Sequence, residues 1–169
     1  MVTGSEGGWG PALPVHGSVV STTARVGNPR RVVLGYALRV GVSSALVVDA
    51  VVHFRDAHLY DANKGSLLSQ GALFRIQAVV ALGLVLLVWV WASRTTWVAA
   101  LLLTGSAVAA VVLYRYVDVG PLAGLPNMYE PSWGPPGKLL SAFAEGTGAL
   151  LALGGLAWTL RAAEPRPSA

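Results

Sequence analysis

The 169-residue sequence contains no cysteine. This absence excludes disulfide bonds, thiol catalysis, iron–sulfur clusters and cysteine-based zinc sites. Charged residues are also scarce, because Asp, Glu, Lys and Arg make up 12% of the chain against about 25% in soluble domains. The net charge of +4 would indicate a nucleic-acid partner only if the cations clustered on a soluble face, and they are scattered. The composition therefore argues against a soluble domain and against nucleic-acid binding.

Hydrophobic residues, in contrast, are abundant at 54% of the chain. They gather in four runs, each close to the ~20 residues that cross a ~30 Å hydrocarbon layer as a helix. Backbone groups in lipid must bond internally, so each run should be helical throughout. The sequence therefore predicts an all-α membrane protein, a bundle of four transmembrane helices. The expected spans are 32–53, 72–92, 97–117 and 139–160.

The segments outside these runs complete the predicted organisation. Residues 1–29 and 163–169 lack hydrophobic periodicity and are expected to be flexible cytoplasmic tails. Residues 30–162 then form the transmembrane domain. The short link at 93–96 should make the second and third helices antiparallel neighbours. Two longer polar segments, 54–71 and 118–138, are expected to be loops on the outer side.

The distribution of arginine and lysine favours one orientation. Four spans put both termini on the same side, and the positive-inside rule makes that side cytoplasmic. We therefore predict an antiparallel up-and-down bundle, N-in and C-in, in the bacterial cytoplasmic (plasma) membrane. The cations expected inside are Arg25, Arg30, Arg31, Arg94, Arg161 and Arg166, near the tryptophans Trp89, Trp91, Trp97 and Trp158 at the inner interface; those expected outside are Arg55, Lys64 and Lys138.

Each of the four runs also carries an ionisable residue at membrane depth, which is costly unless it is paired. From the helix rise, these residues should share a level roughly 5–10 Å below the outer surface. His53 lies four residues after Asp49, on the same helix face. We expect an outer-leaflet cluster that is either an interhelical ion-pair network or the lining of a pocket for an ion or small solute. Its expected members are Asp49, His53, Arg75, Gln77, Tyr114, Arg115 and Glu145.

Small residues at helical spacing indicate where the helices approach closely. In the fourth run, Gly148 and Ala152 follow one another at an interval of one helical turn, and Glu145 shares their face. Glu145 should therefore point inward rather than toward lipid. In the third run, Gly105 and Ala109 have the same spacing, which predicts a second close contact there.

Cofactor sites are mostly excluded. A bis-histidine haem needs two facing histidines, and only His53 lies near a predicted span. A metal site made by Asp49, His53 and His58 is an alternative, since the i, i+4 spacing of the first two suits one ion. The simpler interpretation is a solvated helix end, so no metal and no cofactor is expected.

The second outer loop has a distinctive composition. Its prolines stiffen the chain, and its aromatic side chains offer amphipathic surface. It is expected either to cross the interface as an ordered segment or to present a surface to a partner. The residues of that partner surface would be Asn127, Tyr129, Glu130 and Trp133.

Three short sequence segments resemble those of a known group of membrane proteins. They are Asp49-x3-His53, the segment 73–78 (Leu-Phe-Arg-x-Gln-Ala) and the segment 127–131 (Asn-Met-Tyr-Glu-Pro). Together they are similar to small four-helix integral membrane proteins of unknown function from high-GC bacteria. The resemblance covers the chain from the first to the fourth run and implies the topology, without a chemistry. The layout is also similar to the DoxX-like membrane proteins, although no motif ties the chain to them.

The sequence favours a non-enzymatic integral membrane protein. Its partners would be the lipid bilayer and a larger membrane complex, in which it serves as an accessory or interaction subunit with its functional surface on the outer face. The alternative is a small transport or binding protein that uses the Asp/His/Arg/Glu cluster for an ion or small solute. A third interpretation is a membrane enzyme with His53 and Glu145 as acid and base, which would need both groups within hydrogen-bond reach of the moving proton.

Overall fold

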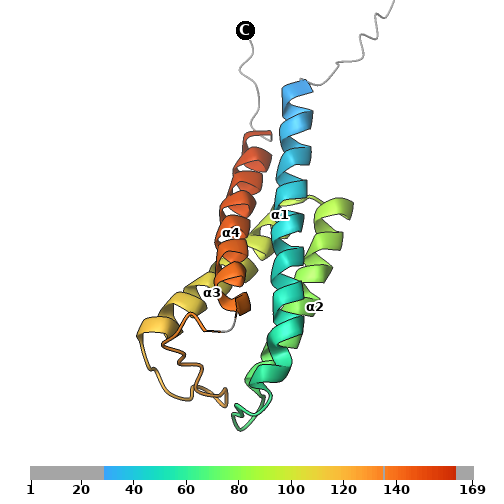
Figure 1. Cartoon of the computed structure of the whole chain (residues 1–169). Coiled ribbons are helices and arrows are strands. Elements are labelled where there is room, and N and C mark those ends of the chain that lie inside the picture. Colours follow the sequence, from blue (N-terminus) through green and yellow to red (C-terminus); the bar gives the residue numbers. More distant parts are fainter. Residues whose placement is uncertain (1–28, 135, 163–169) are drawn as a thin grey trace, which may run out of the picture.

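The computed structural model describes residues 29–134 and 136–162. It contains, in chain order, α1 (Pro29–Asp56), the short 3-10 helix η1 (Ala57–Tyr60), α2 (Gln70–Val90), α3 (Arg94–Tyr116) and α4 (Pro136–Ala162). The prediction of an all-helical protein with four long helices is confirmed (Figure 1). The predicted tails, 1–29 and 163–169, lie outside the described residues except for Pro29, which begins α1.

Each long helix begins two or three residues before the apolar run that predicted it. Serine caps explain two of these starts, because a side-chain oxygen satisfies a free N–H of the first turn. Ser69 Oγ accepts from the backbone N–H of Ala72 at 3.1 Å, and Ser93 Oγ accepts from that of Thr96 at 3.2 Å. The other two helices, α1 and α4, begin with proline, whose fixed φ suits the first helical position.

The four helices carry apolar side chains on their outer surfaces. Each is long and apolar enough to cross a membrane, and between 22% and 33% of each apolar window is buried inside the molecule. Leu86, Phe143 and Leu150, for example, are each at least 68% exposed. Soluble monomers rarely expose contiguous apolar surface on this scale. The fold therefore indicates a multi-pass membrane protein.

The interior is built along α1 and α4. Helix α4 packs against both α1 and α3, and α2 packs on the other side of α1, whereas α2 and α3 touch one another much less. Trp97 of α3 is buried against Gly155 of α4, so its ring packs between helices rather than facing the lipid headgroups. The buried apolar core consists of Val42, Leu46, Ala50, Ala78, Ala81, Leu84, Val88, Trp97, Ala100 and Ala152.

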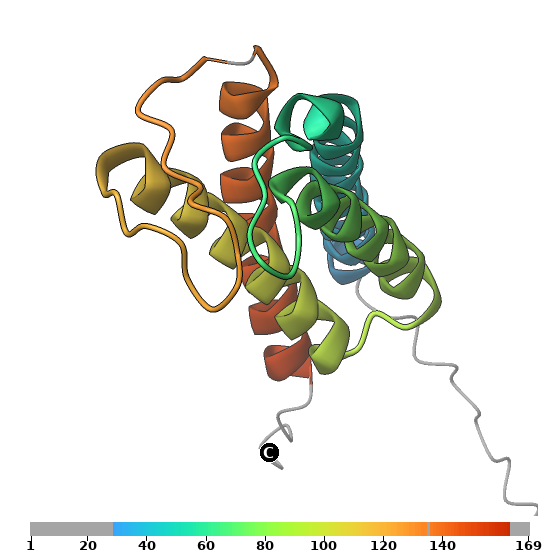
Figure 2. The same ribbon diagram turned by 90° about the horizontal axis from the view of Figure 1, so that it is seen from below.

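Only the first half of helix α3 is packed into the interior of the bundle. Its buried residues all fall between Thr96 and Thr104, and its second half diverges from α2 (Figure 1). The connections α1–α2 and α3–α4 lie over the end of the helices where this divergence occurs (Figure 2). Leu67 N–H donates to the Gly124 carbonyl at 3.0 Å, and Asn63 Nδ2 donates to the Asn127 carbonyl at 2.7 Å. The two loops are thus joined above the space between the helices.

Candidate functional site

A buried group of three ionisable side chains lies near the loop end of the bundle. Asp49 and His53 come from consecutive turns of α1, and Glu145 comes from α4. Their ligand-type atoms lie within 4.8 Å of one another. The exposed fractions of the three residues are 1%, 7% and 0%. We refer to Asp49, His53 and Glu145 as the triad.

Hydrogen bonds fix the imidazole of His53. Its Nδ1 lies 3.0 Å from the backbone carbonyl of Asp49 and 2.9 Å from the Asp49 Oδ1. Both neighbours are acceptors, so Nδ1 carries the proton and donates it. The other ring nitrogen, Nε2, faces Glu145 Oε1 at 3.9 Å. Phe74 of α2 holds the ring from the side in an edge-on contact, with centroids 4.8 Å apart.

Two uncharged side chains complete the polar network. Ser141 Oγ donates to Glu145 Oε1 at 2.9 Å and lies 3.3 Å from Asp49 Oδ1. The amide Nε2 of Gln77 lies 3.4 Å from both oxygens of Asp49 and from Glu145 Oε1. The sequence predicted Gln77 and missed Ser141, although Ser141 precedes Glu145 by one helical turn and so shares its face.

The carboxylates of the triad are incompletely partnered. His53 is the one basic side chain within 4 Å of either carboxylate, among the residues that the structure describes. Glu145 Oε2 is buried and has no hydrogen-bond partner. A buried carboxylate oxygen without a partner is expensive, so this corner of the network is a position where a further positive group would be stabilised.

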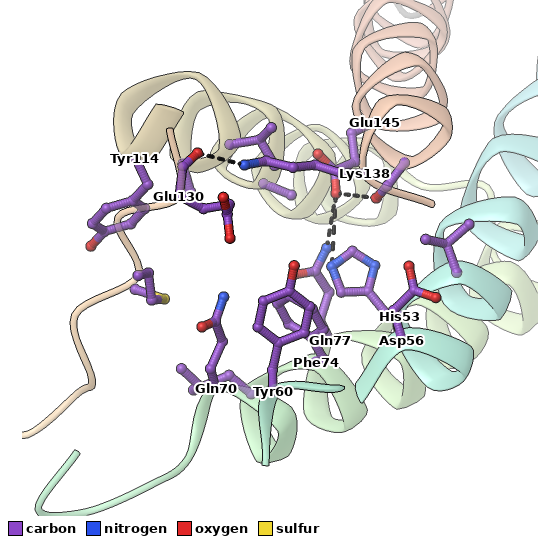
Figure 3. Close-up of a pocket in the computed structure, with 17 residues that line it drawn as sticks. His53, Asp56, Tyr60, Gln70, Phe74, Gln77, Tyr114, Glu130, Lys138 and Glu145 are labelled. Carbon is purple, nitrogen blue, oxygen red and sulfur yellow. Dashed lines mark hydrogen bonds and ion pairs between the residues drawn. The ribbon is translucent and has the colours of Figure 1, made fainter. Parts of the chain in front are cut away.

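The triad does not sit in a solid core, because it borders a cavity of about 230 Å³ between the four helices. His53 and Glu145 line the inner end of this cavity with Gln77, and their side chains point toward one another (Figure 3). The walls are largely apolar. The remaining lining residues are Val52, Asp56, Tyr60, Gln70, Leu73, Phe74, Ala107, Ala110, Val111, Tyr114, Met128, Glu130, Lys138 and Ser141.

Two arginines predicted to join the cluster lie elsewhere. Arg75 forms a bidentate salt bridge with Asp61 in the α1–α2 loop: its two terminal guanidinium nitrogens donate to the two carboxylate oxygens at 2.7 and 2.8 Å. Both side chains of that pair are nearly half exposed. The hydrogen bond from Arg75 holds the pKa of Asp61 below its usual value of 3.8. The prediction failed because a loop carboxylate in the hydrated region offers Arg75 a partner without the cost of burying its charge.

Arg115 was also predicted in the cluster and is held by aromatic rings instead. Its guanidinium lies 5.2 Å from the ring centre of Tyr116 and 5.8 Å from that of Trp133. These are cation–π distances. Because the second half of α3 diverges from the bundle, Arg115 is carried away from the triad. The predicted network of opposite charges from all four helices is therefore wrong for both arginines.

The predicted loop surface is largely bonded within the molecule. The amide of Asn127 donates to Asp118 at 2.9 Å and its oxygen accepts from the Tyr129 N–H at 3.0 Å. The carboxylate of Glu130 accepts from the Ser132 hydroxyl at 2.6 Å. The ring of Trp133 makes cation–π contacts with the Lys138 ammonium and with the Arg115 guanidinium. Tyr129 and Trp133 are each 38% exposed, so they are the part of this surface open to a partner.

Lys138 ties the loop to the cavity mouth. Its ammonium donates to the backbone carbonyls of Glu130 and Ser132, both at 2.9 Å. Lys138, Glu130 and the predicted Tyr114 all line the cavity, at its outer part (Figure 3). The loop is thus an ordered cover for the cavity.

His58 does not belong to the triad, contrary to the metal alternative drawn from the sequence. It is exposed, and its Nδ1 lies 2.7 Å from the backbone carbonyl of Arg55. The helical spacing that joins Asp49 to His53 ends in η1, where the chain turns away. Glu145 of α4 takes the third position instead.

No protein-family model, curated protein or solved structure matches this chain. Its function is therefore inferred from the triad, the cavity and the surface of the bundle.

Proposed function

We propose that this chain is a multi-pass protein of the bacterial cytoplasmic membrane with an up-and-down antiparallel bundle. Both termini would be cytoplasmic, and the α1–α2 and α3–α4 loops would face outward. The four apolar helices support the membrane location. The positive-inside rule supports the orientation, through Arg30, Arg31, Arg94 and Arg161 at the end away from the loops.

Within that membrane, we propose a small binding or transport protein whose cavity takes a cation or a small cationic solute. The observation that carries this proposal is the position of the triad beside a cavity of about 230 Å³. A purely structural ion-pair network would be packed solid. Two carboxylates face one imidazole, so the site favours an occupant of positive charge.

The absence of cysteine from the chain makes this proposal directly testable. Ala110 lines the cavity, and its neighbour Ala109 is exposed on the apolar outside of α3. Each would be changed to cysteine in the full chain, purified in detergent, and treated with a cationic trimethylammonium or an anionic sulfonate methanethiosulfonate. Comparing two reagents on one cysteine cancels differences in thiol reactivity.

We expect Ala110→Cys to react about tenfold or more faster with the cationic reagent, because the acidic side chains that line the cavity, Asp56, Glu130 and Glu145, outnumber its lysine, Lys138, and should concentrate cations. Ala109→Cys should show no such preference. Adding Glu145→Gln to Ala110→Cys should reduce it. An Ala110→Cys variant that reacts with neither reagent, or equally with both, would contradict the proposal.

A second function keeps the outer loop as a partner surface in an accessory subunit. The exposed rings of Tyr129 and Trp133 support it, together with the apolar second half of α3, where Val112 and Tyr116 are exposed. A stoichiometric partner that co-purifies in mild detergent and is lost in Trp133→Ala would favour this function over the first.

A further inference from the structure

We propose that the triad binds one divalent transition-metal ion at the inner end of the cavity, with Asp49, His53 and Glu145 as ligands. This inference rests on the proposed function, because it names the cation that the cavity admits. The three residues supply one imidazole and two carboxylates. Such a mixed set suits zinc, cobalt, iron or manganese better than magnesium or calcium, which prefer oxygen ligands alone.

The imidazole is prepared for this role. A metal-binding histidine typically donates its second N–H to a carbonyl or carboxylate, which fixes the tautomer and the ring. His53 makes such a bond through Nδ1 to the backbone carbonyl of Asp49, 3.0 Å away. The lone pair of Nε2 is then directed toward Glu145 Oε1, 3.9 Å away.

The carboxylate of Glu145 is prepared as well. Ser141 holds its Oε1 at 2.9 Å, while its Oε2 is buried and lacks a partner. This unpartnered oxygen is an independent sign that the site is incomplete without a positive group. A divalent ion would satisfy it and would also balance the charges of the two carboxylates beside a neutral imidazole.

The dimensions are compatible with one ion. The ligand atoms lie within 4.8 Å of one another, whereas zinc bonds of about 2.0–2.2 Å would place two tetrahedral ligands about 3.3–3.6 Å apart. The side chains must therefore close by about an ångström. Three protein ligands leave a coordination position open, and two of the three, His53 and Glu145, line the cavity from which a further ligand would come.

The test uses Co²⁺ as a coloured probe and Zn²⁺ as its competitor. The full chain, freed of any affinity tag, would be purified in detergent, treated with a chelator, and titrated while visible absorption and metal content per chain are measured. We expect one Co²⁺ per chain, with a d–d absorption band that Zn²⁺ abolishes and Mg²⁺ leaves unchanged.

Matched variants locate the ion. Glu145→Gln and His53→Ala should weaken Co²⁺ binding by more than about 100-fold, since even loss of an outer partner costs about 10–100-fold. His58→Ala and Asp61→Asn are the controls, because one is an exposed histidine and the other an exposed carboxylate outside the cavity, and both should bind as the wild type does. Thermal melting without metal would confirm that each variant is folded.

The outcomes separate this inference from the proposed function. A folded wild type that retains no Co²⁺, while Ala110→Cys still prefers the cationic reagent, would overturn the metal site and leave a cavity for other cations. Binding that survives in folded Glu145→Gln and His53→Ala but is lost in His58→Ala would also overturn it. Failure of both the Co²⁺ and the labelling experiments would overturn both proposals.

Discussion

At the scale of single residues, the charges near the loop end fall into two groups with different surroundings. Asp61 and Arg75 meet in the exposed loop region, each side chain more than 40% accessible. Asp49 and Glu145 are buried with His53 and reach no arginine or lysine within 4 Å, among the described residues. The first pair stays near solvent, whereas the second group is buried beside the cavity.

The Asp61–Arg75 pair gives a pH prediction with a definite sign. The pKa of Asp61 is lowered below 3.8 by its bond to Arg75, so the folded protein favours the charged carboxylate. Its contribution to stability is complete above about pH 3.8 and is lost as the pH falls through the lowered pKa. Wild type should therefore melt slightly above Asp61→Asn near neutral pH, and the difference should vanish in acid.

Thermal melting of both proteins across the acid range checks this. The effect should be small, because exposed ion pairs contribute little. Melting points of wild type and Asp61→Asn that differ equally at every pH would contradict the assignment.

The residues of the triad were predictable in part. The spacing of Asp49 and His53 placed them on one face, and the small residues Gly148 and Ala152 turned Glu145 inward, as observed. Ser141 was missed because a serine in an apolar run carries no signal until its partner is known. The two arginines were misplaced because depth along a helix does not reveal the direction in which a long side chain leaves it.

At the scale of helices, two glycines make opposite predictions. A Cβ added to Gly155 would clash with the buried ring of Trp97, whereas one added to Gly105 would meet no atom within 4 Å. Gly155→Ala should therefore lower the free energy of unfolding by about 1–3 kcal/mol, the usual cost of overpacking. Gly105→Ala should instead raise it by up to about 1 kcal/mol, because glycine inside a helix is less stable than alanine and the added Cβ meets open space.

Unfolding in detergent, by heat or by a denaturing surfactant, would measure both variants. Equal effects at the two positions would contradict the packing of α4 against α3. The same comparison corrects the expectation from sequence that Gly105 and Ala109 form a close helix contact: Gly105 borders open space, and Ala109 is exposed.

Helix existence was predictable and helix ends were not. The apolar runs identified all four helices, because hydrocarbon thickness fixes their length. Helices α2 and α3 start earlier than predicted because Ser69 and Ser93 cap them. A search for apolar runs does not detect such polar cap residues. The divergence of α3 could not be predicted from the sequence either. It depends on which residues of α3 face α4, and this is decided by packing rather than by composition.

At the scale of the whole molecule, the proposed orientation predicts which surfaces impermeant reagents reach in intact cells. Ser66 is exposed in the α1–α2 loop, and Thr95 is exposed in the first turn of α3 at the connection from α2. Ser66→Cys should be labelled by a charged maleimide added outside the cells, and Thr95→Cys only after the cells are opened. The reverse pattern would contradict the proposed orientation and leave the bundle unchanged.

The depth of the triad has an electrical consequence. Seven residues of α1 and η1 follow His53, ending with Tyr60, which corresponds to about 10 Å at ~1.5 Å per residue, or at most roughly one third of a ~30 Å hydrocarbon layer. With the loops outward, a divalent ion reaching the triad would cross about a third of the transmembrane voltage. At ~2.3 kcal/mol per charge per 100 mV, an inside-negative potential of that size would strengthen occupancy by about 1.5 kcal/mol, or roughly tenfold. An energised cell would thus fill the site at concentrations that leave it vacant in a depolarised one.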